Sequence, residues 1–151
     1  MLHNIQIKIL DPSIGTKVPV PSYQTTGSAG IDLYACSRQS ISLQPNHCIL
    51  INTGLSVFIK NPQYCGIIAP RSGIGHKKGI VLGNLVGIID ADYQGELKVS
   101  CWNRSTETQI INPYDRIAQL LFVPVFRPTL EIVSEYEETE RGEGGFGSTG
   151  S

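Results

Sequence analysis

The fold is inferred first from the stretch Gly83-Asn84-Leu85-Val86-Gly87-Ile88-Ile89-Asp90-Ala91-Asp92-Tyr93-Gln94-Gly95. It opens with Gly-Asn and closes with Gln-Gly, and pairs of this kind favour turns. Between the turns, the apolar run 85–89 predicts a buried strand. The alternating segment 97–101 predicts a second strand. The sequence therefore predicts a β-hairpin that carries two carboxylates and a tyrosine at one end.

Two residues of this stretch have chemistry suited to a reaction centre. Asp90 directly follows Ile88 and Ile89. A carboxylate beside aliphatic surface is held in a drier place than usual, where it can act as a base on a bound water. Tyr93 offers a flat face against which a ring can pack. Taken alone, however, the stretch fits a surface turn better, because Asp and Gly are favoured in turns for backbone reasons.

Composition limits the class of protein. A chain of 151 residues predicts one domain with a single core. Sixteen Gly and nine Pro, with short β-branched runs between them, favour an all-β fold. The net charge of −1 predicts no general attraction for nucleic acid or an anionic membrane. No apolar stretch approaches the roughly 20 residues of a membrane span.

The cysteines favour a reducing compartment. They lie far apart in the sequence and include no Cys-x-x-Cys pair, which suits neither a zinc site nor a disulfide framework. Isolated cysteines in strand-like runs are most often small core residues. The first four residues also lack a signal-peptide pattern. These features predict a cytoplasmic protein.

Short strands fill the first half of the chain. Ile5, Ile7 and Ile9 alternate with polar residues, as in a half-buried strand. Asp32 lies between apolar residues on another predicted strand, and an inward carboxylate there needs a partner. Such an aspartate is more often a structural hydrogen-bonding residue than a ligand for a bound group. Turn signals then separate further strands, and this spacing indicates a sandwich or barrel; the strands are 41–43, 49–51, 55–59 and 65–69.

The segment 70–79 interrupts the strands and is the best place for a short helix. Its basic side chains, hydroxyl and exposed backbone N–H groups make a plausible phosphate cradle, formed by Arg71, Ser72, Gly73, Gly75, Lys77 and Lys78. The ending of a Walker loop is missing. A solvated basic turn is the alternative. Ser72 and His76 suggest nucleophilic catalysis only weakly, because Ser72 lies in no Gly-x-Ser-x-Gly elbow.

The last strand and the C-terminus have different characters. The run 116–123 is apolar enough for a central buried strand, and its polar exceptions Arg116 and Gln119 need partners. Residues 135–151 form an acidic linker followed by a Gly-rich tail, which predicts a mobile segment. Arg141 in this tail suits a phosphate and Phe146 a ring face, although a plain disordered tail remains the alternative.

Five stretches, taken in order, resemble the motifs of the trimeric deoxyuridine triphosphate nucleotidohydrolases, the dUTPases; they are 29–35, 71–75, 83–95, 116–119 and 141–147. The resemblance implies an all-β, jelly-roll-like distorted barrel with at most a short helix. It implies a β domain at 1–134 and a flexible arm at 135–151 that closes over a neighbouring subunit's active site. It also implies a homotrimer that hydrolyses dUTP to dUMP and pyrophosphate, keeping uracil out of DNA and supplying dUMP for thymidylate.

The resemblance also implies roles for individual residues. Asp90 would activate the water that attacks the α-phosphorus, and Tyr93 would pack under the deoxyribose. The uracil edge would be recognised by Asn84 and by hairpin backbone groups, Ile89 among them. The phosphates would be held by Arg71, Ser72, Gly73 and Gln119. From the tail, Arg141 would close over the phosphates and Phe146 over the base. Asp32 and Arg116 would support the site.

A triphosphate carries about four charges, so its cleavage needs charge neutralisation. The few basic groups leave charge uncompensated, which predicts Mg²⁺ held mainly by substrate phosphates and not by protein ligands. Two other functions remain open. A dCTP deaminase would share the fold but needs a catalytic acid for amine loss. A noncatalytic nucleotide-binding module would need no reactive group.

Overall fold

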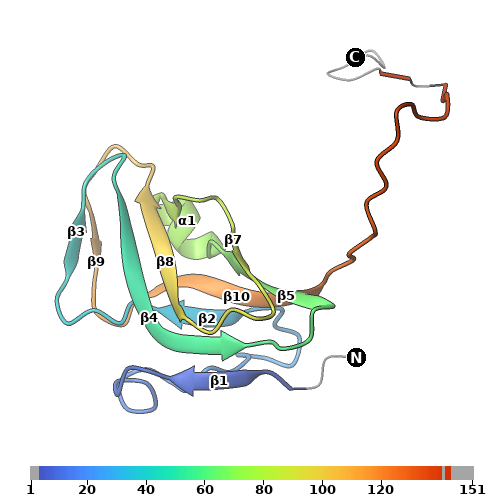
Figure 1. Ribbon diagram of the computed structural model, residues 1–151. Coiled ribbons are helices and arrows are strands. Elements are labelled where there is room, and N and C mark those ends of the chain that lie inside the picture. Colours follow the sequence, from blue (N-terminus) through green and yellow to red (C-terminus); the bar gives the residue numbers. More distant parts are fainter. Residues whose placement is uncertain (1–3, 141, 144–151) are drawn as a thin grey trace.

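The computed structural model describes residues 4–140 and 142–143. Within this part of the chain, ten strands and one short helix make up the regular structure (Figure 1). The strands are β1 (Gln6–Ile9), β2 (Ile31–Tyr34), β3 (Ile41–Leu43), β4 (Cys48–Phe58), β5 (Tyr64–Ala69), β6 (Ile80–Leu82), β7 (Gly87–Ile89), β8 (Glu96–Asn103), β9 (Gln109–Ile111) and β10 (Arg116–Pro124). The helix is α1 (Ser72–Lys78). The predicted all-β class is confirmed.

Two four-stranded antiparallel sheets face one another across the core. Their strand orders are β1-β4-β8-β6 and β2-β10-β5-β7, and β3 and β9 form a separate pair. Inward side chains of both sheets belong to one apolar cluster, which includes Leu33, Val57, Val99, Ile117 and Leu120. Alternate burial along β8 matches a strand with one face on this core. The result is the jelly-roll-like architecture that the family resemblance implied.

The helix forms where the sequence favoured it. Arg71 precedes it in an extended conformation, with φ −91° and ψ 135°. Gly79 follows it with φ 68°, the left-handed conformation with which helices commonly end at glycine. The helix is seven residues long. No helix in the described ranges is long and apolar enough to cross a membrane.

The predicted β-hairpin is wrong. Strand β7 pairs with β5, whereas β8 pairs with β4 and β6, so the two strands lie in different sheets. Residues 90–95 therefore connect the sheets. The predicted burial of 85–89 is also wrong for a single chain, because β7 is an edge strand and Leu85, Val86 and Ile88 are exposed.

Two further expectations need correction. Segments 49–51 and 55–59 were expected to be separate strands, but β4 runs continuously from Cys48 to Phe58. Gly54 has φ 68°, and the pairing with β8 shifts between Asn52 and Ser56, so the turn-like residues form an irregularity within one strand. The predicted strand at the N-terminus is present as β1, but it is an edge strand with Ile7 and Ile9 exposed.

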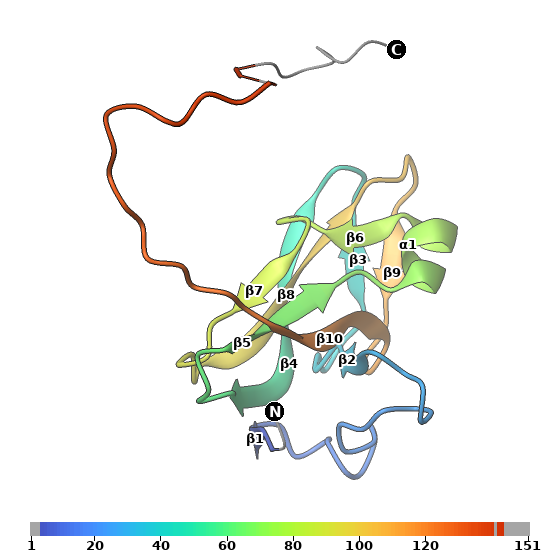
Figure 2. The same cartoon turned by 90° about the vertical axis from the view of Figure 1, so that its right-hand side faces the viewer.

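The chain leaves the sheets after β10. This strand ends at Pro124, before the expected domain boundary at residue 134. Residues 126–140 are exposed, including the large side chains of Phe126, Leu130 and Tyr136. Figures 1 and 2 both show this segment extending away from the sheets.

Candidate active site

A carboxylate and two arginines meet where β2 lies beside β10. Asp32 Oδ1 is 2.7 Å from Arg71 Nε, and Asp32 Oδ2 is 3.3 Å from Arg116 Nη1. The Asp32 side chain is only 12% exposed, whereas that of Arg116 is 49% exposed. Asp32 thus has the partners that an inward carboxylate requires. Two arginines share one negative charge, which leaves this place net positive.

Gln119 lies in the middle of the same sheet and faces the start of the helix. In the strand pairing it is opposite Asp32 on one side and Ala69 on the other. Its side-chain amide donates a hydrogen bond of 2.9 Å to the carbonyl oxygen of Pro70. A Cβ at Gly30 would lie 2.8 Å from Gln119 Oε1, so the absence of a side chain at Gly30 leaves room for the amide.

The first residues of α1 complete this group. Ser72 and Gly73 are exposed, and nothing lies within 4 Å of where a Cβ at Gly73 would be. The open space beside Gly73 lets a ligand approach the backbone closely. Six sequence-predicted residues therefore lie on β2, on β10, and at the start of α1 or directly before it. They are called here the arginine cluster: Asp32, Arg71, Ser72, Gly73, Arg116 and Gln119.

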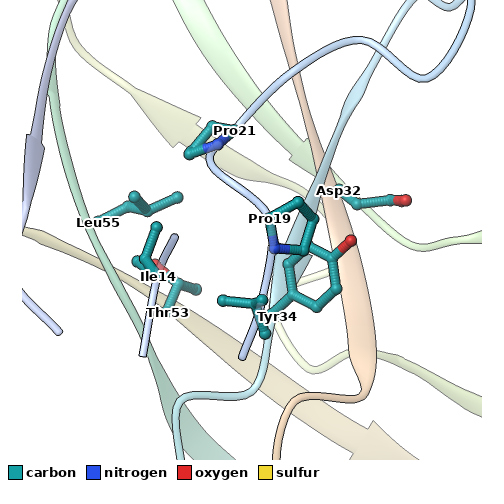
Figure 3. Close-up of a pocket in the computed structure, with 8 residues that line it drawn as sticks. Ile14, Pro19, Pro21, Asp32, Tyr34, Thr53 and Leu55 are labelled. Atoms are coloured by element: carbon teal, nitrogen blue, oxygen red, sulfur yellow. The ribbon is translucent and has the colours of Figure 1, made fainter. Parts of the chain in front are cut away.

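A small pocket lies behind the arginine cluster. Its lining is mostly apolar and comes from the loop after β1 and from strands β2 and β4. Figure 3 shows Pro19 beside Tyr34, with the carboxylate of Asp32 directed away from Ile14 and Leu55. The polar group of Asp32 thus faces the arginines and not this pocket, which we leave out of the candidate site.

The other predicted site residues lie around β7. Asn84 is exposed in the turn before this strand, and Ile89 is its last residue. Asp90 follows directly, and its carbonyl oxygen accepts a hydrogen bond of 3.2 Å from the backbone N–H of Tyr93. Residues 90–95 are called here the aspartate loop. Asp90 is exposed, so the expected dry environment is absent in a single chain, because an edge strand has a neighbour on one side only.

The arginine cluster and Asp90 lie toward opposite ends of β5. Gln119 is opposite Ala69, near the end of this strand, whereas Ile89 is opposite Gly66. Three residues of strand span about 10 Å. Because β7 runs antiparallel to β5, Asp90 lies still further from Ala69, while β5 leads onward into Arg71. One chain therefore does not bring Asp90 together with the arginines.

Arg141 and Phe146, which were expected to close over a substrate, lie outside the described residues. Sequence reasoning also missed groups that hold the site in place. The carbonyl of Pro70 binds Gln119, and the carbonyl of Glu96 accepts from the Tyr93 hydroxyl at 3.0 Å. Backbone acceptors leave no compositional signal. In the described ranges, no group of three or more His, Cys, Asp or Glu is placed to hold a metal ion.

The fold and this site define a jelly-roll-like β protein in which one carboxylate holds a pair of arginines beside the start of a short helix. The family model described as dUTPase matches residues 16–150, and the chain belongs to the dUTPase family. The deoxyuridine 5'-triphosphate nucleotidohydrolase of Legionella pneumophila (strain Paris) is 56% identical over 146 residues, covering 97% of this chain and 96% of that protein. The enzyme of the same name from Coxiella burnetii (strain RSA 331) is 54% identical over 150 residues, covering 99% of both.

Solved structures of phage enzymes share the fold. A point mutant of Staphylococcus bacteriophage 80alpha dUTPase with dUpNHpp has a TM-score of 0.77 and 28% identity, covering 98% of this chain and 99% of that one. A point mutant of the dUTPase from phage phi11 of S. aureus has a TM-score of 0.75 and 26% identity, covering 90% of this chain and 100% of that one. That structure is described as revealing the coordination of a structural Mg(II) ion.

Proposed function

We propose that the chain hydrolyses dUTP to dUMP and pyrophosphate, with Asp90 activating the water that attacks the α-phosphorus. The match to the dUTPase family across residues 16–150 carries this proposal. Relatives more than half identical over nearly the whole chain are named deoxyuridine 5'-triphosphate nucleotidohydrolases. The reaction would keep uracil out of DNA and supply dUMP for thymidylate synthesis.

The arginine cluster would bind the triphosphate. Arg71 and Arg116 are oriented by a single carboxylate, so their remaining N–H groups are available to phosphate oxygens. Ser72 adds a hydroxyl, and Gly73 lets the phosphates approach the backbone. Gln119 is oriented by its bond to Pro70. Such positioning and neutralisation are most of what a phosphoryl-group reaction requires of a protein.

The residues around β7 would bind the nucleoside and supply the base. Asp90 would accept a proton from water as the new bond to the α-phosphorus forms and pyrophosphate leaves. Tyr93 would pack under the deoxyribose. Asn84 and the backbone at Ile89 would recognise the uracil edge. Arg141 and Phe146, in the arm 135–151, would close over the phosphates and the base.

Mg²⁺ suits this arrangement as a cofactor. Mg²⁺ usually keeps several waters and binds through one or two carboxylates together with substrate phosphates. In this chain the substrate phosphates would be the main ligands, because the one carboxylate of the arginine cluster already binds two arginines. When bound to the triphosphate, the ion would neutralise charge on the phosphate oxygens.

The separation of Asp90 from the arginine cluster supports a site shared between chains. A homotrimer would place the aspartate loop of one chain opposite the arginine cluster of another, and the arm of a chain over a neighbour's site. The exposed apolar residues of β7 and the turn before it, Leu85, Val86 and Ile88, suit burial in such an assembly. It would also supply the drier environment that Asp90 lacks in one chain. The four free cysteines support the cytoplasm as the compartment.

Product analysis after incubation with dUTP or dCTP tests the proposed reaction. We expect dUMP and pyrophosphate from dUTP in the presence of Mg²⁺, with no ammonia from dCTP. Ammonia release from dCTP would identify a deaminase. Binding of dUTP without any product would identify a noncatalytic nucleotide-binding protein.

A further inference from the structure

We propose that Gly95 and Ser56 are positioning residues that fix where the Tyr93 ring lies relative to the bound sugar. This position would let the site distinguish deoxyribose from ribose. The inference rests on the proposed function, in which the ring packs under the sugar. Neither residue would touch the substrate. Each would act through Tyr93, one by leaving space and the other by anchoring the backbone.

The hydroxyl end of the Tyr93 ring occupies the space where a side chain at Gly95 would lie. A Cβ added at Gly95 would overlap the Tyr93 hydroxyl oxygen, and it would lie 2.6 Å from Cζ and 3.1 Å from Cε2. Gly95 does not have the positive φ that favours glycine, so its backbone accepts an L side chain. The residue at position 95 must therefore be small because of the ring and not because of the backbone.

The hydroxyl at this end of the ring is also hydrogen-bonded. The Tyr93 hydroxyl donates a hydrogen bond of 3.0 Å to the carbonyl oxygen of Glu96. With its hydroxyl end against Gly95 and its hydroxyl bonded to Glu96, the ring has little freedom about its two side-chain torsions. Tyr93 as a residue is nevertheless 41% exposed in the single chain, so part of it remains open to a ligand.

Strand β4 anchors the backbone that carries these contacts. The buried hydroxyl of Ser56 donates a hydrogen bond of 2.7 Å to the carbonyl of Gln94. On either side of this bond, the Gly54 N–H donates to the Glu96 carboxylate at 3.0 Å, and the Lys60 N–H donates to the Ala91 carbonyl at 2.8 Å. The aspartate loop and the residue after it are thus fixed to β4 and its C-terminal extension at three points, with Ser56 bonded closest to Tyr93 in the chain.

Discrimination between the two sugars depends on one oxygen atom, so a small movement of the ring changes it. If a side chain at position 95 displaced the Tyr93 ring, the space beside the ring for a 2′-hydroxyl of the sugar would change. A contact of this size in a closely fitted site changes substrate preference by roughly 10–200-fold. Gly95 and Ser56 would therefore influence which nucleotide is accepted without taking part in the reaction.

The test compares kcat/KM for dUTP and UTP in Gly95→Ala and Ser56→Ala. We expect Gly95→Ala to lower the dUTP/UTP ratio about tenfold, and Ser56→Ala to lower it by less. Gly27→Ala is the matched control, because nothing lies within 4 Å of its added Cβ. Adding Gly95→Ala to Tyr93→Ala should not lower the ratio further, since no ring remains to be displaced. An unchanged ratio in a folded Gly95→Ala, or an additive loss in the double variant, would overturn the proposal.

A measurement without substrate separates this inference from the proposed activity. In protein labelled with 3-fluorotyrosine, the ¹⁹F signal that disappears in Tyr93→Phe belongs to Tyr93. We expect Gly95→Ala to shift this signal and Gly27→Ala to leave it in place. A Tyr93 signal unmoved by Gly95→Ala would refute the positioning role, whether or not the protein hydrolyses dUTP.

Discussion

Asp32 and Arg71 form a short ion pair between β2 and the residue before α1, with 2.7 Å from Oδ1 to Nε. The same carboxylate binds Arg116, so it orients both arginines of the cluster. In Asp32→Asn we expect kcat/KM for dUTP to fall about tenfold or more, since a hydrogen bond to a charged group contributes about 1.5–3 kcal/mol. The loss of arginine orientation should lower kcat/KM by more than the added net positive charge raises it. Steady-state kinetics matching the parent would show that Arg71 is held in place by other contacts.

The second prediction concerns the proposed base. Asp90→Asn keeps the size of the side chain but cannot accept the proton from water. We expect kcat to fall roughly 10²–10⁴-fold while the affinity for a non-hydrolysable dUTP analogue, measured by calorimetry, stays close to that of the parent. A folded Asp90→Asn with nearly normal kcat would exclude Asp90 from this role.

The third prediction concerns stability. Gly54 has φ 68°, and an added Cβ would lie 2.6 Å from Asp11 Cβ and 3.0 Å from Cys36 Sγ. We expect Gly54→Ala to lower the free energy of unfolding by about 2–4 kcal/mol, because left-handed strain and overpacking act together. Gly27→Ala should stay within about 0.5 kcal/mol of the parent in the same denaturant titration. Equal stability of the two variants would contradict this account of β4.

The fourth prediction concerns the reactivity of two cysteines at about pH 8. Burial raises the pKa of the Cys101 thiol to about 12, and this residue is fully buried. Because the thiolate is the reactive form, Cys101 should resist iodoacetamide at about pH 8 in the folded protein, and it should react once guanidinium unfolds the chain. Exposed Cys48 should be modified first. Peptide mass analysis follows each site, and equal rates for both cysteines in the folded protein would contradict the prediction.

Local sequence signals predicted most of the strands and the short helix. Strand β10 was expected to be central and buried because of its apolar run, and it lies between β2 and β5. The helix was expected where glycines and basic residues interrupt the strands. These features depend on periodicity and turn chemistry, which neighbouring residues determine.

Strand pairing could not be predicted in the same way. Strands β7 and β8 are close in sequence but lie in different sheets. The sequence did not reveal this, because apolar periodicity shows which face of a strand is buried and not which strand lies beside it. Gly54 resembled a turn residue, yet long-range pairing with β8 keeps β4 continuous. The need of Asp32 for a partner was evident from its position, but the choice of Arg71 and Arg116 depends on how β2, β10 and α1 meet.

Complementation between two inactive variants tests most directly whether the site is shared between chains. Asp90→Asn damages the aspartate loop, and Arg71→Ala damages the arginine cluster. The two proteins are unfolded together in equal amounts and refolded, and mixed trimers are confirmed by native mass spectrometry. In each mixed trimer, one of the three sites can combine an intact aspartate loop with an intact arginine cluster.

Random mixing of equal amounts makes about three-quarters of the trimers mixed, so about a quarter of all sites should work. We therefore expect dUTP hydrolysis at roughly a quarter of the parent rate, against almost none for either variant refolded alone. If mixed trimers form but their rate does not exceed that of the separate variants, Asp90 and Arg71 serve the same site within one chain, and the shared site is contradicted.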